Sequence, residues 1–209
     1  MRAVIGIIAA LWAGIATAQD RAGVFDYYVM ALSWSPSWCA ATGDERGAPQ
    51  CDPEADTGWV LHGLWPQYEQ GYPEYCSTTA RDPSRRETAA MGDLFGDGGA
   101  AWYQWKKHGR CAGLSSRDYF DLAREAFDSI EKPAVLRRVT EALRLRPQVI
   151  EQAFLEVNPQ LEPDMITLTC RSGRIAEARV CLTRDLEPRY CSADVVRDCT
   201  RTSTFPPIR

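Results

Sequence analysis

The stretch Ile166-Thr-Leu-Thr-Cys-Arg-Ser-Gly-Arg-Ile-Ala-Glu-Ala-Arg-Val-Cys-Leu182 has the pattern of two β-strands joined by a tight turn. β-Branched and apolar residues lie on both sides of Ser172-Gly173, a dipeptide typical of hairpin loops. We therefore predict strands over Ile166–Cys170 and Ile175–Leu182 that pair antiparallel.

Two further strands are predicted near the N-terminal end. Asp26–Trp34 is rich in aromatic and β-branched residues, which is typical of a core strand. Trp59–Trp65 is a second short apolar run, and we expect Pro66 to end it. The stretches 39–57 and 67–99 are rich in turn-forming residues and are predicted to be long loops.

The middle of the chain has helical periodicity instead. Four helices are predicted, over Ala101–His108, Asp118–Ile130, Pro133–Leu143 and Pro147–Val157. Gly109 is placed to end the first helix, and Ser116 is expected to cap the second. Because strands precede and follow this helical middle, the sequence favours an α+β fold, with a central antiparallel sheet, several packed helices and long loops. The tail from Pro188 is expected to be irregular.

The first residues resemble an export signal. Arg2 supplies a positive start, Ala3–Ile15 is apolar, and Ala16-Thr-Ala18 is a small-residue cleavage site. The apolar run is shorter than the roughly 20 residues that cross a bilayer, so a membrane span is disfavoured. We expect residues 1–18 to be removed, residues 19–209 to form one domain, and the product to be periplasmic or secreted.

Eight cysteines follow this segment: Cys39, Cys51, Cys76, Cys111, Cys170, Cys181, Cys191 and Cys199. An even number in an exported chain predicts four disulfides. Zinc binding is the alternative, but no Cys-x-x-Cys pair is present, and we expect no metal site.

The formal net charge is −4. A protein that holds nucleic acid by its bulk charge would be basic, so a polyanion must here be held locally. Lys106, Lys107 and Arg110 lie close together in the sequence and form a candidate local cluster. A solvated helix face is the other interpretation of these residues.

The chain has only two histidines, His62 and His108, and a glycine follows each. Imidazole can both accept and donate a proton near neutral pH, so two of them brought together suit a general base and a general acid. Gln104, Lys107 and His108 have the spacing of one helix face. The alternative is that both are ordinary histidines without a catalytic role.

Two segments resemble the active-site segments of the ribonuclease T2 family. His62-Gly-Leu-Trp-Pro66 matches the first segment without change. The second has the form His-Glu-Trp-x-Lys-His-Gly-Thr-Cys and corresponds to Tyr103–Cys111. Agreement is found at Trp105, Lys107, His108, Gly109 and Cys111, and differences at Tyr103, Gln104 and Arg110. The stretch Ala31–Cys39 also resembles the opening strand of the family.

The resemblance implies an endonuclease that cleaves single-stranded RNA through a 2′,3′-cyclic phosphate, with little base preference and without a metal or cofactor. It implies that His108 is the base, that His62 is the acid, and that Lys107 stabilises the phosphorane. This division has a physical reason, since transphosphorylation needs one group to remove a proton, another to supply one, and a cation beside the growing charge.

The resemblance also implies substrate-binding residues. Trp65 would stack on a base, which is worth ~1–3 kcal/mol, although core packing is an equal alternative. Tyr68 and Tyr72 are candidates to complete a base pocket. Tyr103 keeps a hydroxyl donor where some members have a histidine, and Arg110 could bind a neighbouring phosphate or lie in solvent.

Gln104 replaces the glutamate of the family motif, which removes a negative charge near the histidines. An amide can still donate a hydrogen bond to a phosphate. We expect activity to be retained but altered, with a pH optimum shifted downward.

The resemblance implies the disulfide pairs Cys39–Cys51, Cys76–Cys111, Cys170–Cys199 and Cys181–Cys191. We expect a monomer that binds RNA and no membrane. Two other functions stay open: a catalytically weakened protein that binds RNA or a protein partner, and a metal-dependent hydrolase. The hydrolase is less favoured, because two histidines without a set of spaced carboxylates make a poor metal site.

Overall fold

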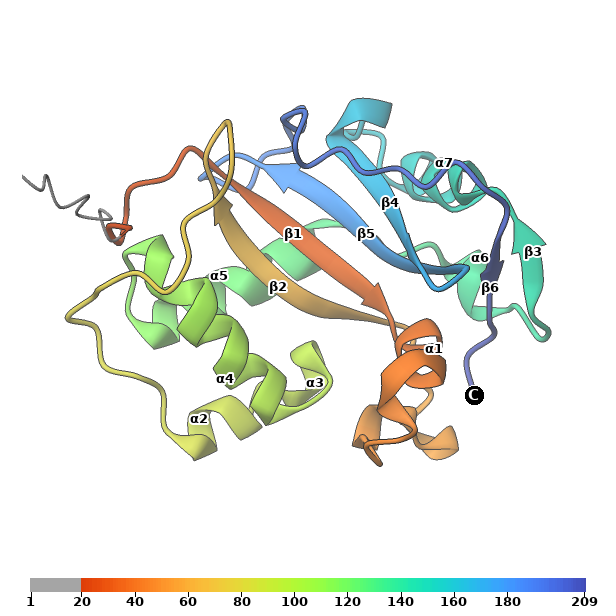
Figure 1. Cartoon of the computed structure of the whole chain (residues 1–209), viewed down its shortest axis with the longest axis horizontal. Helices are drawn as coiled ribbons and strands as arrows, with labels where there is room; N and C mark the ends of the chain where they lie inside the picture. The colour runs from red at the N-terminus through yellow and green to blue at the C-terminus, as the bar shows by residue number, and fades with distance from the viewer. Residues whose placement is uncertain (1–19) are drawn as a thin grey trace, which may run out of the picture.

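The computed structural model describes residues 20–209, so the expected signal segment lies outside the described residues (Figure 1). A six-stranded sheet has the order β2-β1-β5-β6-β3, and β4 pairs with the other side of β5 along part of its length. The strands are β1 Tyr27–Trp34, β2 Trp59–Gln67, β3 Leu143–Leu145, β4 Ile166–Arg171, β5 Arg174–Leu182 and β6 Ser203–Phe205. The predicted α+β class and the β4–β5 hairpin are confirmed. One short contact, between β5 and β6, is parallel.

Strand β2 does not end at Pro66, so that part of the prediction is wrong. Pro66 lies opposite Tyr28 of β1, and β2 continues to Gln67. The physical reason is that β2 is at the edge of the sheet, where proline costs no hydrogen bond to an outer neighbour.

Seven helices are found in the described part of the chain: α1 Ser35–Trp38, α2 Arg85–Ala89, α3 Gly92–Phe95, α4 Gly98–Lys107, α5 Ser116–Ser129, α6 Ala134–Arg137 and α7 Pro147–Val157. The predicted helix over Pro147–Val157 is confirmed. Helix α5 is capped by Ser115 rather than by Ser116. Helix α4 begins earlier than predicted because Asp97 caps it, accepting a hydrogen bond from the Ala100 amide.

Two other helix and loop predictions are wrong in part. The predicted helix over 133–143 is only the single turn α6, because β3 follows and pairs with the C-terminal strand β6. The predicted loop over 67–99 contains α2 and α3, and a reciprocal Ser84–Glu87 capping box starts α2. Within the predicted loop 39–57, short π- and 3₁₀-turns are held by the Cys39–Cys51 disulfide.

Helices α2 to α5 are grouped beside β1 and β2, while α6 and α7 lie near β3, β4 and β6 (Figure 1). Fully buried Trp105 and Tyr119 pack between α4, α5 and the sheet. The Tyr119 hydroxyl donates to the Leu64 carbonyl of β2, which ties α5 to the strand that carries His62. Among the described residues, no helix combines the length and apolar character that a bilayer crossing requires.

Four disulfides join Cys39 to Cys51, Cys76 to Cys111, Cys170 to Cys199 and Cys181 to Cys191. The second of these ties the loop before α2 to the turn after α4. The Tyr75 amide also donates to the Lys107 carbonyl in this region, at 2.8 Å. The end of α4 is therefore anchored to the loop before α2.

Candidate active site

Both histidines lie on the wall of one cavity of about 650 Å³. Strand β2, helix α4, strand β5, the loop at Gly71 and the C-terminal segment form this wall. Its polar and aromatic side chains are His62, Trp65, Gln67, Tyr72, Tyr103, Gln104, Lys107, His108, Arg179, Asp194 and Arg197. The Trp65 ring lies close to both imidazoles, with its centroid 5.1 Å from that of His62 and 5.3 Å from that of His108. Two segments that are distant in sequence thus face one space.

His62 reaches this cavity because of a β-bulge. Ala31 of β1 faces Gly63 of β2, and the next residue, Leu32, faces Leu61. His62 is therefore the extra residue of the bulge, an irregularity that can turn a side chain out of the sheet pattern. Its side chain is 43% exposed, whereas Leu61 is buried in the main core.

A buried carboxylate that the sequence analysis did not identify contacts His62. The Nδ1 atom of His62 lies 2.5 Å from Oε1 of Glu177 on β5. Arg179, two residues further along β5, donates to Oε2 of Glu177 at 2.9 and 2.7 Å. Burial of Glu177 favours a raised pKa, but the hydrogen bonds and charges of His62 and Arg179 outweigh burial and hold its pKa at about 2. The sequence did contain a signal for this pair. Glu177 and Arg179 occupy alternate positions of a largely apolar strand and therefore share one face of it.

His108 has a different environment. It directly follows the last turn of α4, and its residue is only 6% exposed. Burial, with smaller contributions from the charges of Lys107 and His62, lowers the pKa of His108 to about 3. Its imidazole is therefore neutral at pH 7 and has a nitrogen lone pair for accepting a proton.

Lys107 supplies a cation beside the histidines. Its Nζ lies 3.4 Å from a carboxylate oxygen of Glu74 and 5.9 Å from the Tyr72 ring centroid. Burial lowers the pKa of Lys107, but Tyr103, Glu74 and Tyr72 together raise it above its usual value. Lys107 is therefore charged at neutral pH.

Gln104 orients Trp65, the aromatic side chain close to both histidines. It is 3% exposed, and its Oε1 accepts a hydrogen bond from Nε1 of Trp65 at 2.8 Å. The Arg179 guanidinium lies 5.3 Å from the Trp65 ring. Trp65 is thus a half-buried wall of the cavity rather than a member of the main core.

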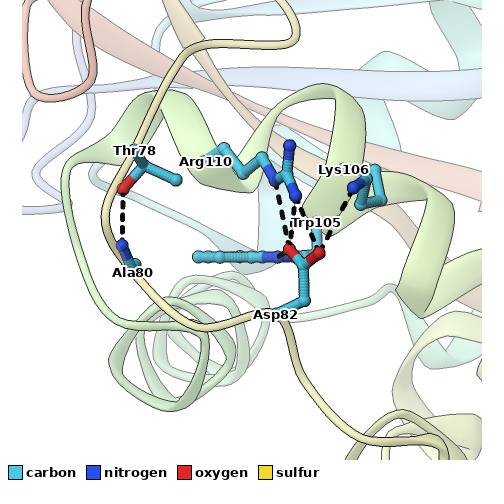
Figure 2. Close-up of polar contacts among 6 residues, drawn as sticks. All are labelled: Thr78, Ala80, Asp82, Trp105, Lys106 and Arg110. Atoms are coloured by element: carbon cyan, nitrogen blue, oxygen red, sulfur yellow. Dashed lines mark hydrogen bonds and ion pairs between the residues drawn. The ribbon is translucent and has the colours of Figure 1, made fainter.

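Two of the predicted binding residues, Tyr68 and Arg110, do not line the cavity that holds both histidines. Tyr68 is partly buried against the main core. Arg110 donates from Nη2 to both carboxylate oxygens of Asp82, each at 2.7 Å (Figure 2). Asp82 also accepts from Trp105 Nε1 and from Lys106, so this cluster fastens α4 and the turn after it to the preceding loop (Figure 2). The local basic cluster is therefore partly neutralised, and only Lys107 faces the cavity.

The C-terminal segment, which was expected to be irregular, contributes one side of the cavity. Asp194 accepts a hydrogen bond from the Gly71 amide at 2.6 Å, which holds the loop that carries Tyr72. The Cys181–Cys191 disulfide fixes the start of this segment to β5. A second cavity, of about 710 Å³, shares His62, Tyr103 and Gln104 with the first and extends toward α1.

The α+β fold, the four disulfides and two histidines around one cavity define a class of small disulfide-linked proteins with a paired-imidazole site. The chain belongs to the ribonuclease T2 family, whose model matches residues 25–191.

Two bacterial relatives support this assignment. The chain is 40% identical over 144 residues to a ribonuclease of Aeromonas hydrophila, which covers 68% of this chain and 64% of that protein. It is 32% identical over 136 residues to a probable ribonuclease of Haemophilus influenzae, which covers 55% of this chain and 47% of that protein. The chain therefore matches less than two thirds of the length of either relative.

Solved structures share the fold. The RNase-related protein from Calystegia sepium superposes with a TM-score of 0.64 at 17% identity, over 87% of this chain and 98% of that one. RNase NT in complex with 5′-AMP gives a TM-score of 0.61 at 22% identity, over 88% and 99%. These similarities concern the fold alone.

Proposed function

We propose that the protein is an endoribonuclease that cleaves single-stranded RNA by transphosphorylation, through a 2′,3′-cyclic phosphate and without a metal or cofactor. The observation that supports this proposal most directly is the pairing of a buried neutral imidazole with a carboxylate-bound imidazole around one cavity. Family membership supports the same class of activity.

His108 acts as the general base. Because its pKa of about 3 leaves it neutral, it can take the proton of the ribose 2′-hydroxyl. The bond between the 2′-oxygen and phosphorus then forms as the bond between phosphorus and the 5′-oxygen breaks. His62 acts as the general acid and gives a proton to the departing 5′-oxygen.

Lys107 and Gln104 stabilise the phosphorane, whose negative charge grows in the transition state. Lys107 offers an ammonium group, and a fixed cation in a partly buried site is most effective where charge develops. The Oε1 atom of Gln104 is occupied by Trp65, which leaves the Nε2 amide hydrogens to donate to phosphate oxygens.

Trp65 and Tyr72 hold the base, and Tyr103 contributes a hydroxyl donor at the junction of the two cavities. Stacking of this kind is tolerant of sequence, which agrees with little base preference. It also gives an acidic chain a way to hold a polyanion without a broad basic surface.

We propose further that residues 19–209 form a single monomeric domain that is exported to the periplasm or the medium. The signal-like sequence of residues 1–18 and the four disulfides support export, because disulfides persist in oxidising compartments. Size-exclusion chromatography and N-terminal sequencing of the exported protein test these points.

The test of the activity is cleavage of single-stranded RNA by the purified protein in EDTA, followed by end analysis. We expect 2′,3′-cyclic phosphate ends, and we expect His62→Ala and His108→Ala each to abolish them. RNA binding without cleavage would favour the catalytically weakened alternative. Loss of cleavage in EDTA would favour the metal-dependent one.

A further inference from the structure

Glu177 is the only described carboxylate bonded to either histidine. Glu177 lies on β5, 115 residues after His62 in sequence, and its side chain is 13% exposed. Arg179 occupies the other carboxylate oxygen, so the group is held from both sides. The family motif has its acidic residue on α4 instead, at the position of Gln104.

We propose that Glu177 is the positioning carboxylate of this active site, acting from β5 through His62 in place of the acidic residue that position 104 lacks. The inference rests on the proposed ribonuclease activity and assigns the acid side of the reaction to the pair His62–Glu177. Glu177 contacts no reacting atom and is therefore a positioning residue rather than a catalytic one.

The hydrogen bond fixes which nitrogen of His62 can reach the substrate. Glu177 is ionised and can only accept a hydrogen bond, so Nδ1 of His62 must donate. The Nε2 atom is then the nitrogen that exchanges a proton with the 5′-oxygen. The carboxylate also stabilises the imidazolium that a general acid must be before it gives up its proton.

The other charged groups around His62 make this carboxylate necessary. Four cationic or protonatable groups face the same space: Arg179 from β5, Arg197 from the C-terminal segment, Lys107 from α4, and His108 directly after α4. The second cavity adds Arg46 and Arg171, and its Asp97 caps α4. In the first cavity, Asp194 accepts a hydrogen bond from the Gly71 amide. The remaining titratable neighbours are the phenols of Tyr72 and Tyr103. Without Glu177, a positive charge on His62 would face mainly other positive charges.

Gln104 cannot take this role. It is uncharged, and its oxygen is committed to Trp65. The geometry therefore divides two roles between two residues. The amide of Gln104 orients Trp65, and the carboxylate of Glu177 stabilises the protonated form of the general acid.

The experiment compares two substrates for Glu177→Gln, a change that keeps the shape of the side chain and removes its charge. One substrate is a dinucleotide, whose leaving 5′-oxygen needs a proton. The other is a nucleoside 3′-(4-nitrophenyl phosphate), whose leaving group departs without one. We expect kcat for the dinucleotide to fall on the order of 10- to 100-fold, the loss typical when a metal-bound histidine loses its hydrogen-bond partner. We expect the aryl ester to react almost as before.

His62→Ala should show the same dependence on the leaving group, while His108→Ala should lose both activities. The control is Glu74→Gln, which removes an equal charge beside Lys107 and should affect both substrates alike. Equal losses on both substrates in Glu177→Gln would overturn the inference.

A readout that does not depend on turnover separates this inference from the proposed function. The ¹⁵N NMR spectrum of the histidines should show Nδ1 of His62 protonated at high pH, and Glu177→Gln should redistribute the proton between the two nitrogens. An unchanged tautomer would overturn the inference even if RNA is cleaved. A protein that shows the tautomer shift but does not cleave RNA would refute only the proposed function.

Discussion

Gly63 lies under the hydrogen bond between Trp65 and Gln104, and we predict that Gly63→Ala damages the candidate site without changing a titratable group. A Cβ atom at this position would lie 2.1 Å from Nε1 of Trp65 and 2.4 Å from Oε1 of Gln104. Ordinary contacts between carbon and its neighbours are about 3.5 Å or longer, so both side chains must move by about 1 Å. The 2.8 Å hydrogen bond between them is then lost.

The size of the effect follows from these displacements. Overpacking a close-packed site costs about 1–3 kcal/mol of the free energy of unfolding. Misplacement of a positioning group by about 1 Å can cost on the order of 100-fold in rate. We therefore expect Gly63→Ala to fold, to unfold at a lower urea concentration, and to lose about 10- to 100-fold in kcat/KM on single-stranded RNA.

Gly92→Ala is the matched control, because the nearest atom to a Cβ there is 4.0 Å away and the residue lies in α3. It should leave activity unchanged and should stabilise the fold by up to about 1 kcal/mol. Full activity in Gly63→Ala, with an unchanged chemical shift of the Trp65 indole N–H, would refute the reasoning.

Three further predictions concern charge and cross-links. Asp82→Asn should lower the free energy of unfolding by about 1–2 kcal/mol at pH 7, after allowance for partial exposure, because burial raises the carboxyl pKa but Arg110, Trp105 and Lys106 hold it at about 2. Since this folded-state pKa is depressed, the contribution to stability is present above about pH 4 and is lost as pH falls toward 2. Urea titrations should therefore give different free energies of unfolding for the native protein and Asp82→Asn at pH 7, and similar values near pH 2. Replacing Cys76 and Cys111 by serine should destabilise the protein by about 4 kcal/mol, and replacing Cys39 and Cys51 by about 3 kcal/mol, because the two disulfides close loops of 35 and 12 residues. Equal losses of stability in calorimetry would argue against the loop-entropy account. Gln104→Glu places a carboxylate near His108 and should raise the pKa of that imidazole from about 3, which moves the acid limb of the pH–rate profile to higher pH. Identical profiles for the two proteins would show that residue 104 exerts no electrostatic effect on His108.

Local patterns were sufficient for much of the fold. The strand over Asp26–Trp34, the hairpin after Ile166 and the helix over Pro147–Val157 each follow from periodicity and turn residues within one segment. The pairing of β3 with β6 could not be predicted, because each strand has three residues and the two are about 60 positions apart. Tertiary pairing there overrides the helical pattern of 133–143.

The same distinction explains which site residues were found. Gln104, Lys107 and His108 were identified because one turn of helix brings them together. The role of Glu177 depends on a partner 115 residues away, which no local pattern reveals. Arg110 was misleading for the converse reason, since its neutralising partner Asp82 lies 28 residues earlier in a segment without clear periodicity.

The proposed reaction gives the two imidazoles different roles, and their environments differ accordingly. Burial keeps His108 neutral and able to accept a proton, whereas Nδ1 of the more exposed His62 contacts the Glu177 carboxylate. Two groups of one chemical type can serve as base and acid at the same pH only if the protein separates their protonation states in this way. The separation does not require an acidic residue at position 104. It requires that one ring is buried directly after α4 and that the other is placed on a bulge facing a charged pair on β5.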